Sequence, residues 1–102
     1  NKWHLKAANE GYKVAQHNLG MSYEFGQGFS KDYKKAIKWY KKAIKQNFKD
    51  SQFRLGYLYN TGKGLVKDYN LAAKWYKKSA NQGHVLAQYN LGLLYEYGDG
   101  VN

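Results

Sequence analysis

The chain repeats itself every 36 residues, and this internal period constrains its fold more than any other feature of the sequence. Trp3, Trp39 and Trp75 stand 36 residues apart. The other recurring positions keep the same spacing, and they are Gln16/Gln52/Gln88, Leu19-Gly20/Leu55-Gly56/Leu91-Gly92, Tyr23/Tyr59/Tyr95, the glycine pairs 26 and 28, 62 and 64, and 98 and 100, and Asp32-Tyr33/Asp68-Tyr69. A fixed period of about 20 to 50 residues is typical of stacked repeats, in which each unit buries its apolar face against its neighbours.

Each unit is predicted to contain two helices separated by a Gly-x-Gly connection. Asp32 and Asp68 stand where an N-cap side chain would accept the free amide groups at the start of a second helix. Gly11, Asn47 and Gly83 fit the left-handed residue that follows the end of a second helix. The expected first helices span about residues 12–25, 48–61 and 84–97, and the expected second helices span about residues 32–46 and 68–82, with the end of another at 1–10.

The side chains of each helix divide into a packed face and an outer face. On a helical wheel of the first helix, one arc holds Ala15, Gln16, Leu19, Gly20, Ser22 and Tyr23. Glycine inside a helix costs about 1 kcal/mol relative to alanine, so the recurrence of Gly20, Gly56 and Gly92 predicts close helix contacts. On the second helix, one face holds Tyr33, Ala36, Ile37, Tyr40, Ala43 and Ile44, and the other holds Lys34, Lys38, Lys41, Lys42 and Lys45. These lysines are expected to face solvent.

The repeating motif resembles that of a known family. It reads A-x-x-x-L-G-x-x-Y-x-x-G-x-G, followed by a lysine-aspartate step and A-x-x-W-Y-x-K-A, and it runs over residues 15–43, again over 51–79 and in part over 87–101. This pattern resembles the Sel-one-like repeat (SLR), a relative of the tetratricopeptide repeat, whose own period is about 34 residues. The resemblance implies an all-α, right-handed alpha-alpha superhelix (solenoid) of antiparallel helix pairs, with the first helices along its concave side. It also implies an adaptor role in holding other proteins together.

We expect a single solenoid over residues 1–102 with about three repeats. Its predicted parts are the second helix of a preceding repeat at 1–10, repeats at 11–46 and 47–82, and the first half of a repeat at 83–102. The chain begins with Asn1 inside a predicted helix, so we expect it to be a piece of a longer protein. Both ends leave apolar faces uncovered, and end-to-end self-association is a further expectation.

Composition excludes several other classes of protein. Aromatic residues make up 18% of the chain and hydrophobic residues 43%, which is too much packing material for a disordered segment. No stretch approaches the roughly 20 apolar residues of a membrane span, so no membrane insertion is predicted. The absence of cysteine from the sequence excludes disulfides, thiolate zinc sites and cysteine nucleophiles.

The sequence predicts neither a catalytic site nor a metal site. His4, His17 and His84 fall at different places in the repeat and share no face, so neither metal ligands nor a catalytic triad is indicated. Asp32 and Asp68 recur, but we interpret them as helix caps. We therefore expect no enzyme activity, no cofactor and no metal, and we expect a scaffold for protein-protein interaction.

The arc of the first helix that is left after packing is the predicted binding surface. In a superhelix this arc lines the concave groove, and its aromatic and apolar residues recur on a face that should be solvated. By resemblance to tetratricopeptide-like grooves, Asn18, Arg54 and Asn90 could hold the backbone or a carboxylate of a bound peptide. The candidate partner-binding residues are His17, Asn18, Met21, Phe53, Arg54, Tyr57, Tyr89, Asn90 and Leu93, and the same arc carries Glu24, Phe25, Asn60, Thr61, Glu96 and Tyr97.

Two alternatives to this groove remain open. Phe53, Tyr57 and Tyr89 could instead pack against neighbouring repeats, because short solenoids use many aromatics internally. The lysine-rich stretch 31–45 could bind an acidic protein or nucleic acid, because 17 basic residues against 7 acidic ones give a net charge of +10. We rank this surface, and nucleic acid in particular, below a protein partner in the groove. A buried aromatic contact is commonly worth about 2 kcal/mol or more, whereas an exposed ion pair is worth about 0 to 1 kcal/mol.

Overall fold

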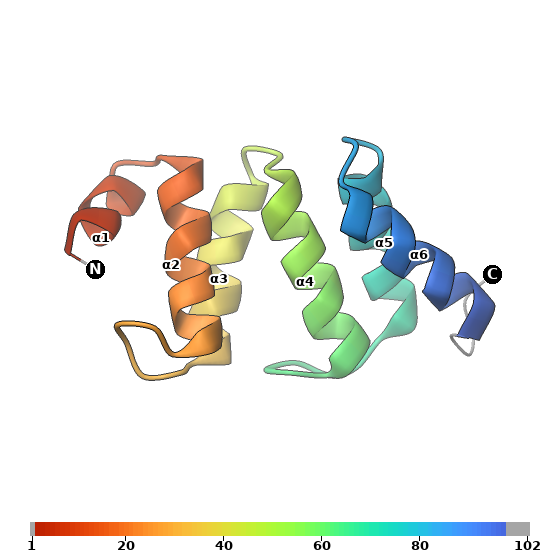
Figure 1. Ribbon diagram of the computed structural model, residues 1–102. Helices are drawn as coiled ribbons and strands as arrows, with labels where there is room; N and C mark the ends of the chain where they lie inside the picture. The colour runs from red at the N-terminus through yellow and green to blue at the C-terminus, as the bar shows by residue number, and fades with distance from the viewer. Residues whose placement is uncertain (1, 98–102) are drawn as a thin grey trace.

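The computed structural model is a row of antiparallel helices. It describes the backbone of residues 2–97 and the side chains of residues 5–97. The helices are α1 (Lys2–Asn9), α2 (Lys13–Phe25), α3 (Tyr33–Ile44), α4 (Lys49–Thr61), α5 (Tyr69–Ala80) and α6 (Val85–Tyr97). Figure 1 shows α1 at one end of the row and α6 at the other. Each helix packs mainly on the helices that precede and follow it in the sequence. The molecule measures 42 × 26 × 17 Å. Every described helix begins and ends within two residues of its predicted bounds.

Expectations that fall on the ends of the chain lie outside the described part. They concern the side chains of Trp3 and His4 and the third Gly-x-Gly connection at Gly98 and Gly100. The helices between these ends lack the combination of length and apolar character that a bilayer span requires.

The residues that punctuate the helices behave as predicted. Asp32 caps α3, since its Oδ1 accepts a hydrogen bond from the Lys35 amide at 3.1 Å. Asp68 does the same for α5. Asn47 has a φ of 59°, in the left-handed region that glycine usually occupies, and Gly11 and Gly83 have φ values of 95° and 84° at the matching positions. The turn between successive repeats is therefore the same in all three places.

The apolar core runs along the row as a series of overlapping clusters. One cluster joins α3 to α4 through Ala36, Ile37, Tyr40, Leu55 and Leu58. Two similar clusters join α1 to α2 and α3, and α4 to α5 and α6. Tyr40 and Tyr76 are the largest fully buried side chains. Because each cluster shares helices with the next, the repeats form one continuous solenoid and not separate domains.

Glutamines at 36-residue spacing tie each repeat to the next. Gln46, just after α3, donates from Nε2 to the Gly11 carbonyl oxygen at 2.8 Å and to Gln16 Oε1 at 3.1 Å. Gln82 makes the equivalent bonds one repeat later, to the carbonyl oxygen of Asn47 and to Gln52 Oε1. The recurrence of Gln16 and Gln52 thus reflects hydrogen bonding at the inter-repeat turn.

The predicted close contacts at glycine are confirmed for two of the three positions. A Cβ added to Gly20 would lie 2.5 Å from the Tyr40 ring, and one added to Gly56 would lie 2.8 Å from the Tyr76 ring. The prediction is wrong for Gly92, where a Cβ would meet nothing within 4 Å in the described chain. In that part of the chain no second helix packs on this face of α6.

This difference predicts opposite effects of the same substitution. Gly20→Ala should lower the free energy of unfolding by about 1 to 3 kcal/mol, because the new methyl group overlaps the fully buried Tyr40 ring. Gly92→Ala should raise it by up to about 1 kcal/mol, because alanine favours the helix and the added methyl group has room. Urea denaturation followed by circular dichroism measures both. Equal effects of the two substitutions would contradict the close contact at Gly20.

Candidate functional site

The nine predicted groove residues occupy three positions of the repeat, all on the first helices α2, α4 and α6. The first position holds His17, Phe53 and Tyr89, the second holds Asn18, Arg54 and Asn90, and the third holds Met21, Tyr57 and Leu93. Of these, Asn18 and Met21 are half-buried on α2. The structure places these three positions in different surroundings.

The first position belongs to the interface between repeats and not to a solvated groove. His17 and Phe53 are only 7% and 8% exposed. The His17 ring lies 5.2 Å from that of Phe48, and the Phe53 ring stacks at 4.7 Å on that of His84. In both places the following repeat covers the side chain, so the expectation of a solvated position is wrong for these two residues. Tyr89 is 65% exposed, and no following repeat covers it in the described chain.

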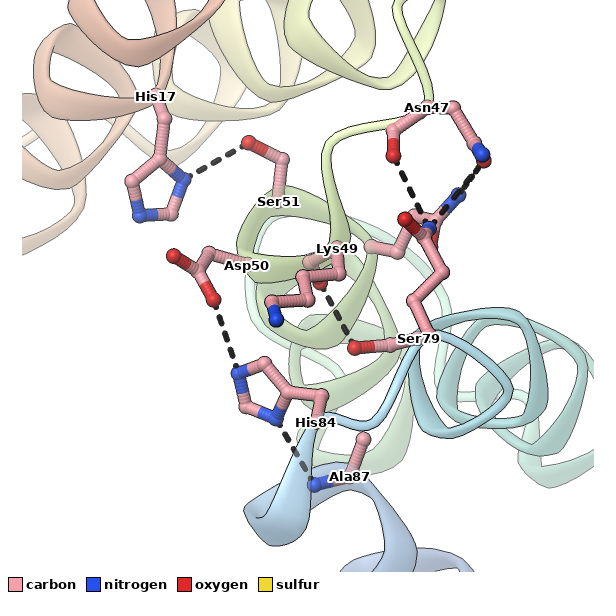
Figure 2. A network of polar contacts seen from close by, with 10 residues as sticks. His17, Asn47, Lys49, Asp50, Ser51, Ser79, His84 and Ala87 are labelled. Atoms are coloured by element: carbon pink, nitrogen blue, oxygen red, sulfur yellow. Dashed lines mark hydrogen bonds and ion pairs between the residues drawn. The ribbon is translucent and has the colours of Figure 1, made fainter.

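A polar network surrounds this interface and brings two histidines together (Figure 2). His17 Nδ1 and Ser51 Oγ share a hydrogen bond of 2.8 Å. His84 Nδ1 accepts from the Ala87 amide at 3.1 Å, so the proton of a neutral imidazole lies on Nε2, which is 3.2 Å from Asp50 Oδ1. The expectation that the histidines share no face is therefore wrong for His17 and His84, which flank Asp50.

These histidines do not form a metal site with their neighbours. Among the residues that the structure describes, no three His, Cys, Asp or Glu side chains converge as metal ligands would. Burial lowers the pKa of His17, with the charges of Asp50 and Glu24 acting in the opposite direction. The neutral imidazole is consequently the form that this interface accommodates.

At the second position Arg54 is already occupied by an internal partner. Its Nε donates to Glu24 Oε1 at 3.0 Å and its Nη2 pairs with Glu24 Oε2, while the Tyr40 hydroxyl donates to Glu24 Oε1 at 2.6 Å. Glu24 is 3% exposed. Burial acts to lower the pKa of Arg54, but the hydrogen bond and charge of Glu24 outweigh it and raise the pKa. In the free chain the carboxylate of Glu24 therefore occupies the position that was predicted for a ligand carboxylate, and the role of Arg54 in holding a ligand stays a prediction.

The stacking of rings around Arg54 reinforces this closed arrangement. The guanidinium carbon lies 5.1 Å from the centre of the Phe25 ring and 4.7 Å from that of Tyr57. Glu24 takes two of the five guanidinium N–H donors, and the aromatic rings lie against the faces of the group, so its charge is compensated from within the chain. We refer to Tyr40, Glu24 and Arg54 as the charged cluster.

One repeat later the same three positions hold uncharged groups. Tyr76 is equivalent to Tyr40, Asn60 to Glu24 and Asn90 to Arg54. The Tyr76 hydroxyl is buried and has no hydrogen-bond partner within the described residues. Burial raises its pKa, and hydrogen-bonding interactions with the side chains of Asn60 and Asn90 act to lower it. The two amides therefore lie close to the hydroxyl, although neither makes a hydrogen bond of good geometry with it. We refer to Tyr76, Asn60 and Asn90 as the amide cluster.

A cavity of about 350 Å³ opens beside the amide cluster. Its wall is formed by side chains of α4, α5 and α6, namely Tyr57, Asn60, Tyr69, Asn90, Leu93, Leu94 and Tyr97. The cavity brings together the predicted groove residues Tyr57, Asn90 and Leu93. Asn60 and Tyr97 come from the same predicted arc, whereas Tyr69 and Leu94 were not predicted to line a site. The sequence signal that marks this site is the change from Glu24 in one repeat to Asn60 at the equivalent position of the next.

The lysines of α3 lie on a separate surface, as predicted. Lys34, Lys38, Lys41, Lys42 and Lys45 are all exposed, and with Ile37 they line a hollow of about 460 Å³. No carboxylate pairs with these lysines among the described residues. This lysine face therefore carries a net positive charge into solvent.

Comparison with protein families identifies the repeat. The Sel1 repeat matches at residues 1–12, 13–48, 49–84 and 85–102, which together cover the chain. The last three of these ranges each start with the first residue of a first helix, α2, α4 or α6. A search of the curated proteins found no match.

Solved structures with the same fold include three bacterial proteins. The crystal structure of a Sel1 repeat protein from Oxalobacter formigenes has a TM-score of 0.92 and 46% identity over 99% of this chain and 41% of that chain. A protective antigen of uropathogenic Escherichia coli with an SLR fold has a TM-score of 0.86 and 38% identity over 94% of this chain and 21% of that one. Helicobacter pylori cysteine rich protein B has a TM-score of 0.80 and 33% identity over 88% of this chain and 68% of that one. These likenesses confirm the predicted helical solenoid, and this chain spans less than half of the first two structures.

The two clusters predict contrasting effects of removing one hydroxyl group. Tyr40→Phe should lower the free energy of unfolding by about 1.5 to 3 kcal/mol, because it takes a hydrogen bond from a buried carboxylate. Tyr76→Phe should leave it unchanged or raise it by up to about 1 kcal/mol, because the lost hydroxyl had no partner. Chemical denaturation of the two variants side by side measures this, and a loss at Tyr76 as large as that at Tyr40 would mean that its hydroxyl is satisfied.

The buried His17 predicts a loss of stability in mild acid. Its pKa is lowered by folding, so below about pH 6.5, the ordinary value for histidine, the unfolded chain binds more protons than the folded one. Stability should fall as the pH drops from about 7, with a slope of up to about 1.4 kcal/mol per pH unit from this group, and level off below the folded pKa. His17→Phe, which copies Phe53, should remove this component. The measurement is the free energy of unfolding of the unmodified chain minus that of the His17→Phe variant, taken across this pH range. A difference that does not change with pH would contradict the prediction.

Proposed function

Because this chain belongs to the Sel1 repeat family, we propose that it is a scaffold that binds an extended segment of another protein along the face formed by α2, α4 and α6. Solenoid repeats leave one continuous surface exposed on their stacked helices, and such surfaces bind other macromolecules. Within this face the cavity beside the amide cluster is the anchoring point.

The observation that carries this proposal is a cavity that combines exposed apolar side chains with the side-chain amides of Asn60 and Asn90. Leu93 and Tyr97 are 38% and 74% exposed at its rim. The Tyr76 hydroxyl beside Asn60 and Asn90 is buried without a partner in the described chain. A mostly apolar cavity with a few convergent polar groups is typical of binding sites. A peptide chain supplies both kinds of contact at once.

The lysine face contributes to the rate of encounter in this proposal. Its exposed ammonium groups lie on α3, away from the cavity between α4 and α6. Charges outside an interface raise association rates and lose their effect in salt, whereas contacts inside it govern dissociation. Added salt should accordingly slow binding with little effect on the dissociation rate.

Selection from a random-peptide phage library against the immobilised chain tests the proposal. Peptides enriched by the unmodified chain should bind the Leu93→Ala, Tyr97→Ala double variant at least about tenfold more weakly, because truncation of central contacts commonly costs more than about 1 kcal/mol. Both side chains are exposed, so the variant should fold normally, as circular dichroism can verify.

Two control variants separate the cavity from the rest of the surface. Val14→Ala removes an apolar side chain that is 54% exposed at the start of α2, and it should leave affinity unchanged. Lys38→Ala with Lys41→Ala should change the association rate only. If the enriched peptides bind the Leu93 and Tyr97 variant normally but lose affinity for the lysine variant, the acidic-partner alternative is correct and the groove is not the site.

A further inference from the structure

We infer that the cavity between α4 and α6 selects an uncharged carboxamide side chain, glutamine or asparagine, in the segment that it binds, and rejects the corresponding carboxylate. This inference rests on the proposed binding of an extended protein segment, and it names the side chain that enters the anchoring cavity. It is drawn from the chemistry of the amide cluster and from its contrast with the charged cluster.

The hydrogen-bonding groups of the amide cluster complement a primary amide. Asn60 and Asn90 each present a carbonyl acceptor and an NH₂ donor, and the Tyr76 hydroxyl can donate or accept. That hydroxyl is fully buried, has no partner among the described residues and is not part of the cavity lining, so the amides of Asn60 and Asn90 are the polar groups that a ligand would meet. A carboxamide offers one acceptor oxygen and one nitrogen with two donor hydrogens, both bonded to the same carbon, which matches this mixed set. A carboxylate offers acceptors only, so it could use the NH₂ groups of the two asparagines but would leave their carbonyl groups without a donor.

The electrostatics of the cavity also favour an uncharged group. None of its lining residues carries a charge, and the neighbouring Arg54 is neutralised by Glu24. Two exposed lysines contact its lining residues, since Lys67 Nζ lies 3.4 Å from the Tyr69 hydroxyl and Lys63 Nζ lies 5.6 Å from the centre of the Tyr57 ring. Both ammonium groups are in contact with solvent. Moving a carboxylate from water into such a site is unfavourable unless a desolvated cation compensates for it.

The walls of the cavity suit the aliphatic part of such a side chain. Tyr57, Tyr69, Leu93 and Leu94 provide apolar surface around the amides. The volume of about 350 Å³ lies at the lower end of the range for small-molecule sites, about 300 to 1,000 Å³, which is room for one side chain with its adjoining backbone. A methylene stem packed on tyrosine rings would carry its terminal amide to Asn60 and Asn90.

The charged cluster provides the contrast within the same chain. At the equivalent place one repeat earlier, Glu24 satisfies both the Tyr40 hydroxyl and Arg54. The repeat can therefore fill this position with its own side chains, and the change to Asn60 and Asn90 leaves it open. Substituting Asn60→Glu together with Asn90→Arg should rebuild the closed arrangement and abolish binding.

Nuclear magnetic resonance of the ¹⁵N-labelled chain tests the inference with defined probes. The probes are three blocked tripeptides, acetyl-Ala-Gln-Ala-N-methylamide and its counterparts with Glu or Met at the centre, so that only the glutamine side chain carries a primary amide. The glutamine tripeptide should shift the side-chain amide signals of Asn60 and Asn90 in a saturable way. At neutral pH the Glu and Met tripeptides should bind at least about tenfold more weakly, because a site built to hydrogen-bond a polar group rejects analogues that lack it.

Matched variants make each outcome decisive. Asn90→Leu should weaken binding of the glutamine tripeptide while the backbone spectrum stays folded, and Lys63→Ala with Lys67→Ala should leave the preference for glutamine unchanged. Equal binding of the three tripeptides, or no shift at Asn60 and Asn90, would overturn the inference. The proposed function would still stand in those cases if the phage-derived peptides depend on Leu93 and Tyr97. Conversely, a glutamine-specific shift combined with phage-derived peptides that ignore those residues would overturn the proposed function alone.

Discussion

The seating of a buried tyrosine ring on a helical glycine fixes the geometry on which the rest of this solenoid depends. Tyr40 lies against Gly20 and Tyr76 against Gly56, at distances that leave no room for a methyl group. The contact brings the two helices of a pair close together and buries the whole phenol. It also determines where the hydroxyl emerges, which is beside the next first helix along the row. The identity of the residues there then decides whether the hydroxyl is satisfied from within the chain, as Tyr40 is by Glu24.

The period of the sequence was sufficient to predict the helices, their caps and the packing glycines, because these features depend on contacts within one repeat or on one backbone conformation. Asp32 and Asn47 illustrate this, since a capping carboxylate and a left-handed residue are local requirements. The burial of His17 and Phe53 could not be predicted in the same way. A helical wheel shows which residues share a face of one helix, but it does not show how much of that face the following repeat covers. Gly92 shows the converse, since it keeps the period of the sequence but no second helix packs on it within the described residues.

The polar contacts of the site were harder to predict because they join different repeats. Glu24 and Arg54 are 30 residues apart in the sequence, and the match between them depends on how far α4 is displaced from α2. The same displacement brings His17 and His84 to either side of Asp50 (Figure 2). In a repeat protein, positions that keep the period mark the packing that every unit needs. Positions that break it, such as Asn60 where Glu24 sets the pattern, mark where one unit differs from the others in what it can bind.

The energetics explain why an open position in this solenoid would be built from amides. If Glu24 were present without Arg54, an unpaired buried charge would cost several kcal/mol, so a charged cluster is stable only when it is complete and closed to other molecules. A buried hydroxyl between two amides lacks one hydrogen bond, and the corresponding penalty is about 1 to 3 kcal/mol. A folded repeat can tolerate that amount, and the amides of Asn60 and Asn90 remain at the cavity wall, where a partner can bond to them. An uncharged cluster can therefore remain open in the free chain and still form hydrogen bonds with a ligand. A charged cluster at the same position cannot do this, because its groups already pair with each other.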